Sequence, residues 1–253
     1  MRGKNPRGFA VSLAAAALAV ASVAASIAPA GAADPFRLLM ADTDTGRHPM
    51  RWNPCQDSIT YKVNTLNARE DGRSKAVART RARHEIIDAV SQIDRLTGMT
   101  FEYTGTTQEI PTGDNWSDRQ GPGDEIVIAY VTNRKPASRS TLLAGGAWGM
   151  GGQVYMYEGD TVVVGRGFVV LDSDKARTMR PGFGPGARRG NLVLHELGHV
   201  MGLDHVPDPR LLMNPVLTDK TPDGFAAGDR AGLAELGIKA GCIDGAEDFW
   251  PGS

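Results

Sequence analysis

Residues 195–205 read HELGHVMGLDH, and this stretch decides how the rest of the chain is interpreted. The chain has 253 residues but only five histidines, and three of them lie here. A glutamate follows the first histidine, and a glycine precedes the last by three positions. Histidine is the commonest protein ligand of metal ions, so this concentration predicts a metal site.

A helix would bring two of these histidines together. We expect it to begin after an N-cap at Asn191 and to continue through residue 201. His195 and His199 then share one face, about 6 Å apart along the axis. Two imidazoles at this separation can bind one zinc ion at about 2.0–2.1 Å. Glu196 is rotated by about 100° from His195, which places it beside the ion, where it can hold a water molecule.

Gly202 predicts how the third histidine joins them. Glycine can take the left-handed conformation that ends a helix and turns the chain sharply. His205 can then return as the third ligand. Three neutral imidazoles leave the fourth position of zinc open for water, as in a catalytic site. Zinc lowers the pKa of that water towards ~7, and Glu196 can take its proton and pass it to the leaving amine.

The composition is that of an ordinary globular protein, with 41% hydrophobic residues, 23% charged residues and a formal net charge of −1. It predicts one domain with a hydrophobic core. Neither the net charge nor any Lys/Arg cluster indicates a nucleic-acid partner. The densest basic stretch, 73–83, alternates with alanine and valine and is interpreted as the solvated face of a helix.

Residues 1–32 have the order of a secretory signal peptide. Basic residues come first, an apolar run follows over 9–28, and Ala30-Gly31-Ala32 supplies a cleavage site. We expect cleavage after Ala32 and a secreted, extracellular protein that has no contact with a membrane afterwards. The alternative is an uncleaved anchor, although the run is mostly alanine. No other segment reaches the ~20 apolar residues needed to cross a bilayer.

Only two cysteines are present, Cys55 and Cys242. In an oxidising compartment an even pair usually forms a disulfide. Closing so long a loop would contribute about 4–5 kcal/mol to stability before strain is subtracted. The alternative is that one cysteine binds a metal.

The apolar periodicity predicts the order strand, helix, three or four strands, helix, loop, helix. The helices are expected at 74–96, around the histidine motif, and at 227–236. The strands are expected at 59–64, 100–105, 125–131, 153–157 and 167–172. Strands grouped apart from helices indicate an α+β domain, which we place at 51–253. Residues 33–50 lack clear periodicity and are interpreted as a short linker or pro-segment.

The motif, together with DPRLLMNP at 208–215, resembles the metzincin zinc endopeptidases, most closely the matrixin (matrix-metalloprotease-like) branch. RWNPCQDSITYKVN at 51–64 resembles the first strand of such domains, and DRAGLAELG at 229–237 resembles their last helix. The resemblance implies a zincin-like catalytic domain. Its parts are a twisted, mixed but mostly parallel sheet, an antiparallel edge strand, two helices behind the sheet and a small C-terminal subdomain after the motif.

The resemblance also implies roles for later residues. Met213 would form the Met-turn beneath the zinc ligands. A protein or peptide substrate would bind in extended form, paired with an edge strand within 142–156. The loop at 214–224 would shape the specificity pocket.

Several positions depart from the matrixin pattern. Val206 stands where matrixins usually have serine or threonine, no tyrosine follows Met213, and the cysteine-switch motif is absent. Latency would therefore work differently. Asp42 or Asp44 could cap the zinc, although an exposed acidic linker is the simpler interpretation.

Further metal sites are less clearly indicated. Only His48 and His84 lie outside the motif, so we expect the second, structural zinc site of animal matrixins to be missing. Calcium could replace it, although carboxylates at strand ends are usually solvated turns. The candidate calcium ligands are Asp172 with Asp174, or Glu158 with Asp160.

The sequence thus predicts a secreted, monomeric, zinc-dependent endopeptidase. His195, His199 and His205 would bind one catalytic Zn²⁺, and Glu196 would act as general base and acid. Three alternatives stay open: a zinc-binding recognition module without proteolysis, a hydrolase of cell-wall peptide amides, and a structural zinc protein. The last is disfavoured because no fourth ligand lies near the motif.

Overall fold

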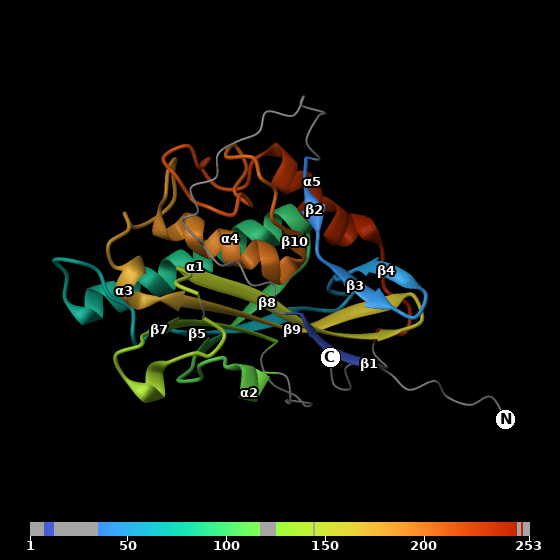
Figure 1. Cartoon of the computed structure of the whole chain (residues 1–253), viewed down its shortest axis with the longest axis horizontal. Coiled ribbons are helices and arrows are strands. Elements are labelled where there is room, and N and C mark those ends of the chain that lie inside the picture. Colours follow the sequence, from blue (N-terminus) through green and yellow to red (C-terminus); the bar gives the residue numbers. More distant parts are fainter. Residues whose placement is uncertain (1–7, 13–34, 117–124, 144, 247–248, 250–253) are drawn as a thin grey trace.

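The computed structural model describes residues 8–12, 35–116, 125–143, 145–246 and 249. Its centre is a six-stranded sheet in the order β1-β8-β9-β7-β5-β6 (Figure 1). The strands are β1 (Gly8–Ser12), β5 (Ile59–Asn64), β6 (Phe101–Thr106), β7 (Ile126–Val131), β8 (Gly149–Glu158) and β9 (Thr161–Asp172).

The strands β6, β5, β7 and β9 run parallel, and β8 pairs antiparallel with β9. The predicted mixed, mostly parallel sheet is therefore confirmed. The outermost strand, β1, pairs antiparallel with β8. It lies inside the segment interpreted as a signal peptide, whose cleavage stays a prediction. Loss of β1 would leave β8 as the edge strand, overlapping the expected range 142–156.

Both faces of the sheet are covered. Every residue of β7 is buried, as in sheets with packing on two sides. Its alternate residues Ile126 and Ile128 belong to the main core, whereas Val127 and Ala129 belong to a second cluster. In Figure 1, α1 (Lys75–Thr97), α4 (Arg189–Met201) and α5 (Ala227–Leu236) lie on one side of the sheet, and the short α2 (Gly113–Trp116) lies on the other.

The long helix α1 ends as its sequence predicts. Ser74 is the N-cap and accepts a hydrogen bond from the Val77 amide. Gly98 closes the helix with φ 72°, a left-handed conformation that suits glycine. The predicted range 74–96 is thus confirmed to within one residue. The last helix, α5, has the predicted bounds.

The predicted N-cap of α4 is wrong. The helix begins at Arg189, and the fully buried Asn191 lies inside it. The side-chain amide nitrogen of Asn191, Nδ2, donates to the carbonyls of Gly184, Gly186 and Pro222. The loop before the helix already supplies carbonyls to the first free amides, since Arg189 N–H donates to Arg180 O and Gly190 N–H to Gly182 O. Because these backbone partners come from a loop, local sequence could not show them.

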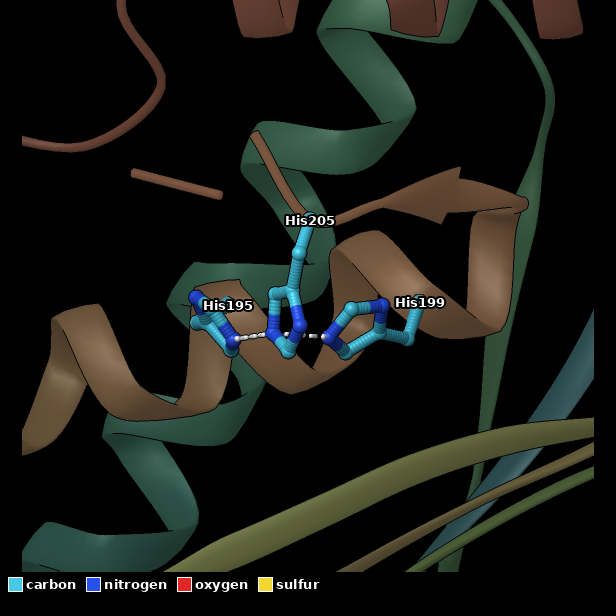
Figure 2. A group of neighbouring side chains, drawn as sticks. All are labelled: His195, His199 and His205. Atoms are coloured by element: carbon cyan, nitrogen blue, oxygen red, sulfur yellow. Dashed lines mark hydrogen bonds between the residues drawn. The ribbon is translucent and has the colours of Figure 1, made fainter. Parts of the chain in front are cut away.

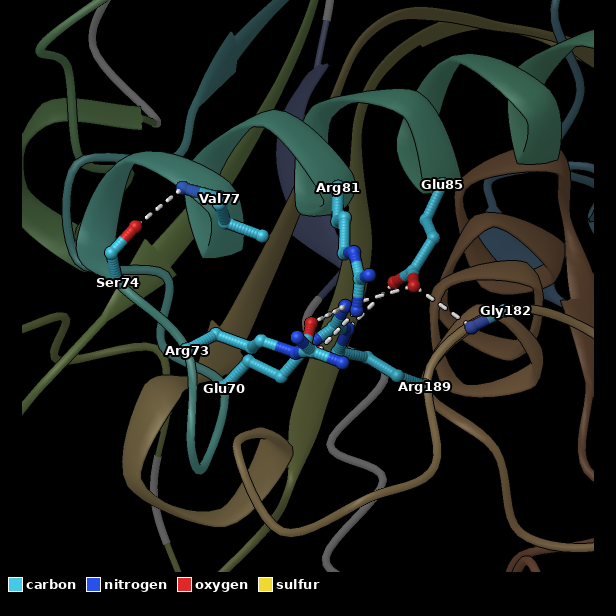
Figure 3. A network of polar contacts seen from close by, with 8 residues as sticks. All are labelled: Glu70, Arg73, Ser74, Val77, Arg81, Glu85, Gly182 and Arg189. Atoms are coloured by element: carbon cyan, nitrogen blue, oxygen red, sulfur yellow. Dashed lines mark hydrogen bonds and ion pairs between the residues drawn. The ribbon is translucent and has the colours of Figure 1, made fainter.

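A buried ion-pair network fixes the start of α4 against α1 (Figure 3). Arg189 donates to Glu85 at 2.6 and 2.8 Å and to Glu70 at 3.3 Å. The Gly182 amide also donates to Glu85 at 2.8 Å. A buried charge is tolerated when it is paired and hydrogen-bonded, so the network sets the position of the helix that carries the histidine motif.

Residues 35–50 form regular structure that their weak periodicity did not predict, and their interpretation as a linker or pro-segment stays a prediction. They contain β2 (Arg37–Leu38), β3 (Met40–Thr43) and β4 (Gly46–Pro49). The strands β3 and β4 form a hairpin, and β2 pairs with β10 (Leu203–Asp204). Leu39, Ala41 and Met50 belong to the main core. The partner of β2 lies far away in the chain, so a local pattern could not predict the pairing.

The remaining elements are short: α3 (Ser173–Ala176) and two 3₁₀ turns, η1 (Pro136–Ser138) and η2 (Ile238–Ala240). In the part of the chain that the structure describes, no helix is long and apolar enough to span a bilayer.

The predicted disulfide between Cys55 and Cys242 is present, with a Cα–Cα distance of 5.2 Å. Neighbouring hydrogen bonds join the same two segments. Asn53 Oδ1 accepts from the amides of Cys55 and Ile243, and Arg51 donates to Gly241 O. The C-terminal segment is thus tied to the chain just before β5.

The double variant Cys55→Ser/Cys242→Ser should unfold at a lower urea concentration than the parent. The disulfide spans 187 residues, and losing so large a loop constraint should lower the free energy of unfolding by about 4–5 kcal/mol. Reducing agent should bring the parent to the stability of the variant and leave the variant unchanged. Equal stabilities under oxidising conditions would show that the bridge does not form in the isolated protein.

Candidate metal centre

Three imidazole rings converge at one point (Figure 2). His195 and His199 project from α4, and His205 comes from the chain just after β10. The Nε2 atom of His205 lies 3.1 Å from Nε2 of His195 and 3.1 Å from Nε2 of His199. Ligand nitrogens about 2.05 Å from a tetrahedral zinc ion would be separated by about 3.3 Å. The spacing and the donor type therefore fit one zinc ion.

Gly202 makes the predicted turn. It has φ 111°, and its amide donates back to the carbonyls of Gly198 and His199. A Cβ built at Gly202 would lie 2.4 Å from Met50 O, so a side chain would clash as well as strain the backbone. The chain leaves α4 at this residue and returns through β10 to His205.

The other ring nitrogens of the two helical histidines are also partnered. Nδ1 of His195 lies 2.7 Å from Leu212 O, and Nδ1 of His199 lies 2.8 Å from Leu203 O. A carbonyl only accepts, so each Nδ1 carries the proton and each Nε2 presents its lone pair. This arrangement fixes the tautomer and the ring orientation that a metal ligand needs.

Burial keeps the rings uncharged. It lowers the pKa of His195 to about 3, with a smaller contribution from His205. Burial also lowers the pKa of His199 well below its usual value, and that of His205 in the same direction. Metal binding requires neutral imidazole, so the site is ready to bind at neutral pH without losing protons from the rings.

Glu196 belongs to α4. Its side chain faces β8 and is fully buried. Neither carboxyl oxygen has a hydrogen-bond partner among the described residues. Burial raises the pKa of Glu196 to about 8, and the nearby Gly151 amide offsets only part of this rise. Cβ atoms built at Gly149 and Gly151 would lie 2.6 Å from Glu196 Oε1 and 2.0 Å from Glu196 O. The glycines of β8 therefore let the helix and its glutamate approach the sheet.

Met213 is buried against the histidine helix, and its role as the Met-turn stays a prediction. A Cβ built at Gly198 would lie 2.5 Å from Met213 Sδ, so the helix leaves space for the thioether. The Val206 amide donates to Met213 O at 3.0 Å. The backbone around Met213 is thereby fixed to the residue that follows His205.

Asp229 is a buried residue beside the site whose role was not predicted from the sequence. Its buried carboxylate accepts hydrogen bonds from the amides of Leu212, Met213 and Ala226. Leu212 is also the residue whose carbonyl orients His195. Asp229 occupies the third position of α5, where acidic residues often cap a helix, and that position was the available signal.

The candidate pro-segment carboxylate Asp42 does not reach the metal centre. It lies on the β3–β4 hairpin, exposed and paired with Arg47. His48 contacts Thr45 on the same hairpin, and His84 is exposed on α1. Within the described ranges, the three motif histidines form the one group of three or more His, Cys, Asp or Glu side chains that could hold a metal.

The candidate calcium ligands have other partners. Asp172 accepts from the amides of Asp174 and Lys175 as the N-cap of α3. Asp174 binds Thr132 and Arg134. The pair Glu158 and Asp160 lies at the turn between β8 and β9. Calcium binding at either place stays a prediction.

Without metal, the buried Glu196 carboxyl should make the protein less stable as the pH rises. The unfolded chain ionises this group near pH 4.5, whereas the folded chain keeps the proton up to about pH 8. Between these two pH values the unfolded state thus binds fewer protons than the folded state. The free energy of unfolding therefore falls as the pH rises. Glu196→Gln removes the effect, so its stability relative to the parent should grow by about 2–4 kcal/mol from pH 5 to pH 8.

Urea unfolding with a chelator present measures this difference. Glu235→Gln, which changes an exposed glutamate on α5, is the matched control and should track the parent. A pH-independent difference between Glu196→Gln and the parent would mean that the carboxyl is solvated in solution.

Comparison with known proteins agrees with this geometry. A search of curated proteins finds no match. The family model described as Matrixin matches residues 51–236, which include all three motif histidines, Glu196 and Met213. Because this match covers well over half of the chain, the protein belongs to the matrixin family.

Proposed function

We propose that this protein is a secreted, monomeric zinc endopeptidase that hydrolyses peptide bonds in extended protein segments. The matrixin family is a family of zinc metallopeptidases, which supplies the general class. The observation that carries the proposal for this chain is the convergence of three Nε2 atoms beside a buried, unpartnered carboxyl group.

Each residue has a distinct role in the proposed reaction. His195, His199 and His205 hold the ion through Nε2. A bound zinc ion supplies a Lewis acid that lowers the pKa of water and polarises the scissile carbonyl. Glu196 accepts a proton from the attacking water and delivers it to the leaving nitrogen. A carboxyl group can serve both steps when its pKa lies near the working pH.

The sheet supports binding of an extended substrate. The strand β8 runs alongside α4, and its outer edge accepts the antiparallel strand β1 through residues 153–157. When β1 is absent, the backbone N–H and C=O groups of β8 that pair with it are free to pair with another extended segment. We propose that substrate takes this place. The loop at 214–224 would contribute the specificity pocket.

The proposal for secretion has two supports. The first 32 residues have the order of a signal peptide. The disulfide between Cys55 and Cys242 is of the kind that persists in oxidising compartments.

Replacement of Glu196 should separate metal binding from catalysis. Parent, Glu196→Ala and Glu196→Gln are purified with zinc, and their zinc content and cleavage of casein are measured. All three should hold one zinc ion per chain. The parent should cleave casein, and the variants should cleave it more slowly by a factor of about 10²–10⁴ because the proton-transfer group is lost. A chelator should abolish cleavage, and zinc should restore it.

Glu235→Gln again serves as the control and should cleave like the parent. Loss of zinc from both Glu196 variants would make the glutamate a ligand, against the proposed role. A zinc-loaded parent that cleaves no protein or peptide would support a recognition module. Cleavage confined to cell-wall peptides would support the amidase alternative.

A further inference from the structure

Residues 35–39, here called the N-terminal strap, lie across the segment that carries the third histidine. Leu38 pairs with Leu203, and Arg37 pairs with Asp204, so that β2 forms a two-stranded sheet with β10. The Leu39 amide donates to Gly202 O at 2.7 Å. The whole path from the turn at Gly202 to the residue before His205 is therefore paired with the strap.

The strap also pairs with the residue that orients the second histidine, His199. Leu203, the partner of Leu38, accepts the hydrogen bond from Nδ1 of His199 at 2.8 Å. A shift of β10 would move this carbonyl and the backbone of His205 together. Outer partners of this kind orient metal ligands, and their loss weakens metal binding.

The helix α5 is shaped to receive the strap. A Cβ built at Gly228 would lie 1.9 Å from Pro35 O. A Cβ at Gly232 would lie 2.6 Å from Leu203 Cδ2 and 3.0 Å from Phe36. Glycine is unfavourable inside a helix, so two glycines four positions apart indicate a demand for close packing. Leu39 and Met50 continue this contact into the main core.

We infer that the N-terminal strap is a positioning element of the metal centre and is retained in the working protein. It fixes β10, and through β10 it fixes the ring of His199 and the backbone of His205. This inference rests on the zinc site of the proposed function. It reverses the expectation of a removable pro-segment, because loss of these residues would loosen the site instead of uncovering it.

A proline at position 39 tests the inference in the full-length chain. Leu39→Pro removes the amide that bonds to Gly202 O, and Leu39→Ala is the matched control, which shortens the side chain but keeps that amide. Zinc dissociation constants are measured by competition with a chromophoric chelator. Leu39→Pro should bind zinc about tenfold more weakly than Leu39→Ala. Equal dissociation constants in two folded variants would overturn the inference.

A second variant approaches the strap from α5, in case the proline variant does not fold. Gly228→Ala should favour the helix locally, yet it should weaken zinc binding because the new methyl group displaces Pro35. Gly113→Ala, whose new Cβ would have its nearest neighbour at 3.4 Å, is the control. Zinc binding by Gly228→Ala as tight as that of the parent would count against the inference.

Mass spectrometry of the secreted, zinc-loaded protein gives an independent test. Its first residue should lie at or before Pro35. Active protein that begins after residue 39 would overturn the inference. These measurements are separate from proteolysis: a parent that binds zinc but cleaves no substrate would refute the proposed function and leave the role of the strap intact.

Discussion

The turn at Gly202 constrains the whole metal centre, because two ligands precede it on a helix and the third follows it on a returning strand. The backbone there has φ 111°, and Met50 O leaves no space for a side chain. The hydrogen bond from Leu39 to Gly202 O holds the same peptide from outside. The position of His205 thus depends on Gly202. It also depends on the backbones of Leu39 and Met50, more than 150 positions earlier, which contact that glycine.

Two side chains from outside the helix bind the backbone carbonyls just before this turn. Trp52 Nε1 donates to Val200 O, and the Gln153 amide donates to the carbonyls of His199 and Val200. These carbonyls belong to the last turn of α4, where a helix leaves carbonyls without partners of its own. Pairing them with β8 and with the segment before β5 fixes the end of the helix against the sheet. The rings of His195 and His199 are then oriented by a rigid support instead of by a mobile terminus.

Local sequence was sufficient for the elements whose signals are local. Ser74 and Gly98 marked the ends of α1, the alternation at 59–64 marked β5, and the spacing from His195 to His205 marked the cluster of three imidazoles. The failures depend on distant partners. Asn191 looks like a helix cap, but loops at 184–186 and 222 bring carbonyls to it. The strap could not be predicted from local sequence. It pairs with β10 and packs on α5, and both elements are more than 160 positions away.

Two buried carboxyl groups, those of Asp229 and Glu196, differ in their hydrogen-bond partners. Asp229 accepts three backbone amides, which oppose the rise in pKa that burial causes, and it holds the Met213 turn. At Glu196 only the nearby Gly151 amide opposes this rise, so burial raises the pKa of Glu196 to about 8. A carboxylate with three amide donors stabilises the fold, although burial still leaves the pKa of Asp229 above its usual value. An unsatisfied one costs stability, and the fold tolerates that cost where a bound cation and a reacting water supply the missing partners. In the proposed reaction, the bound ion and the attacking water would supply the partners that the Glu196 carboxyl lacks in the folded chain.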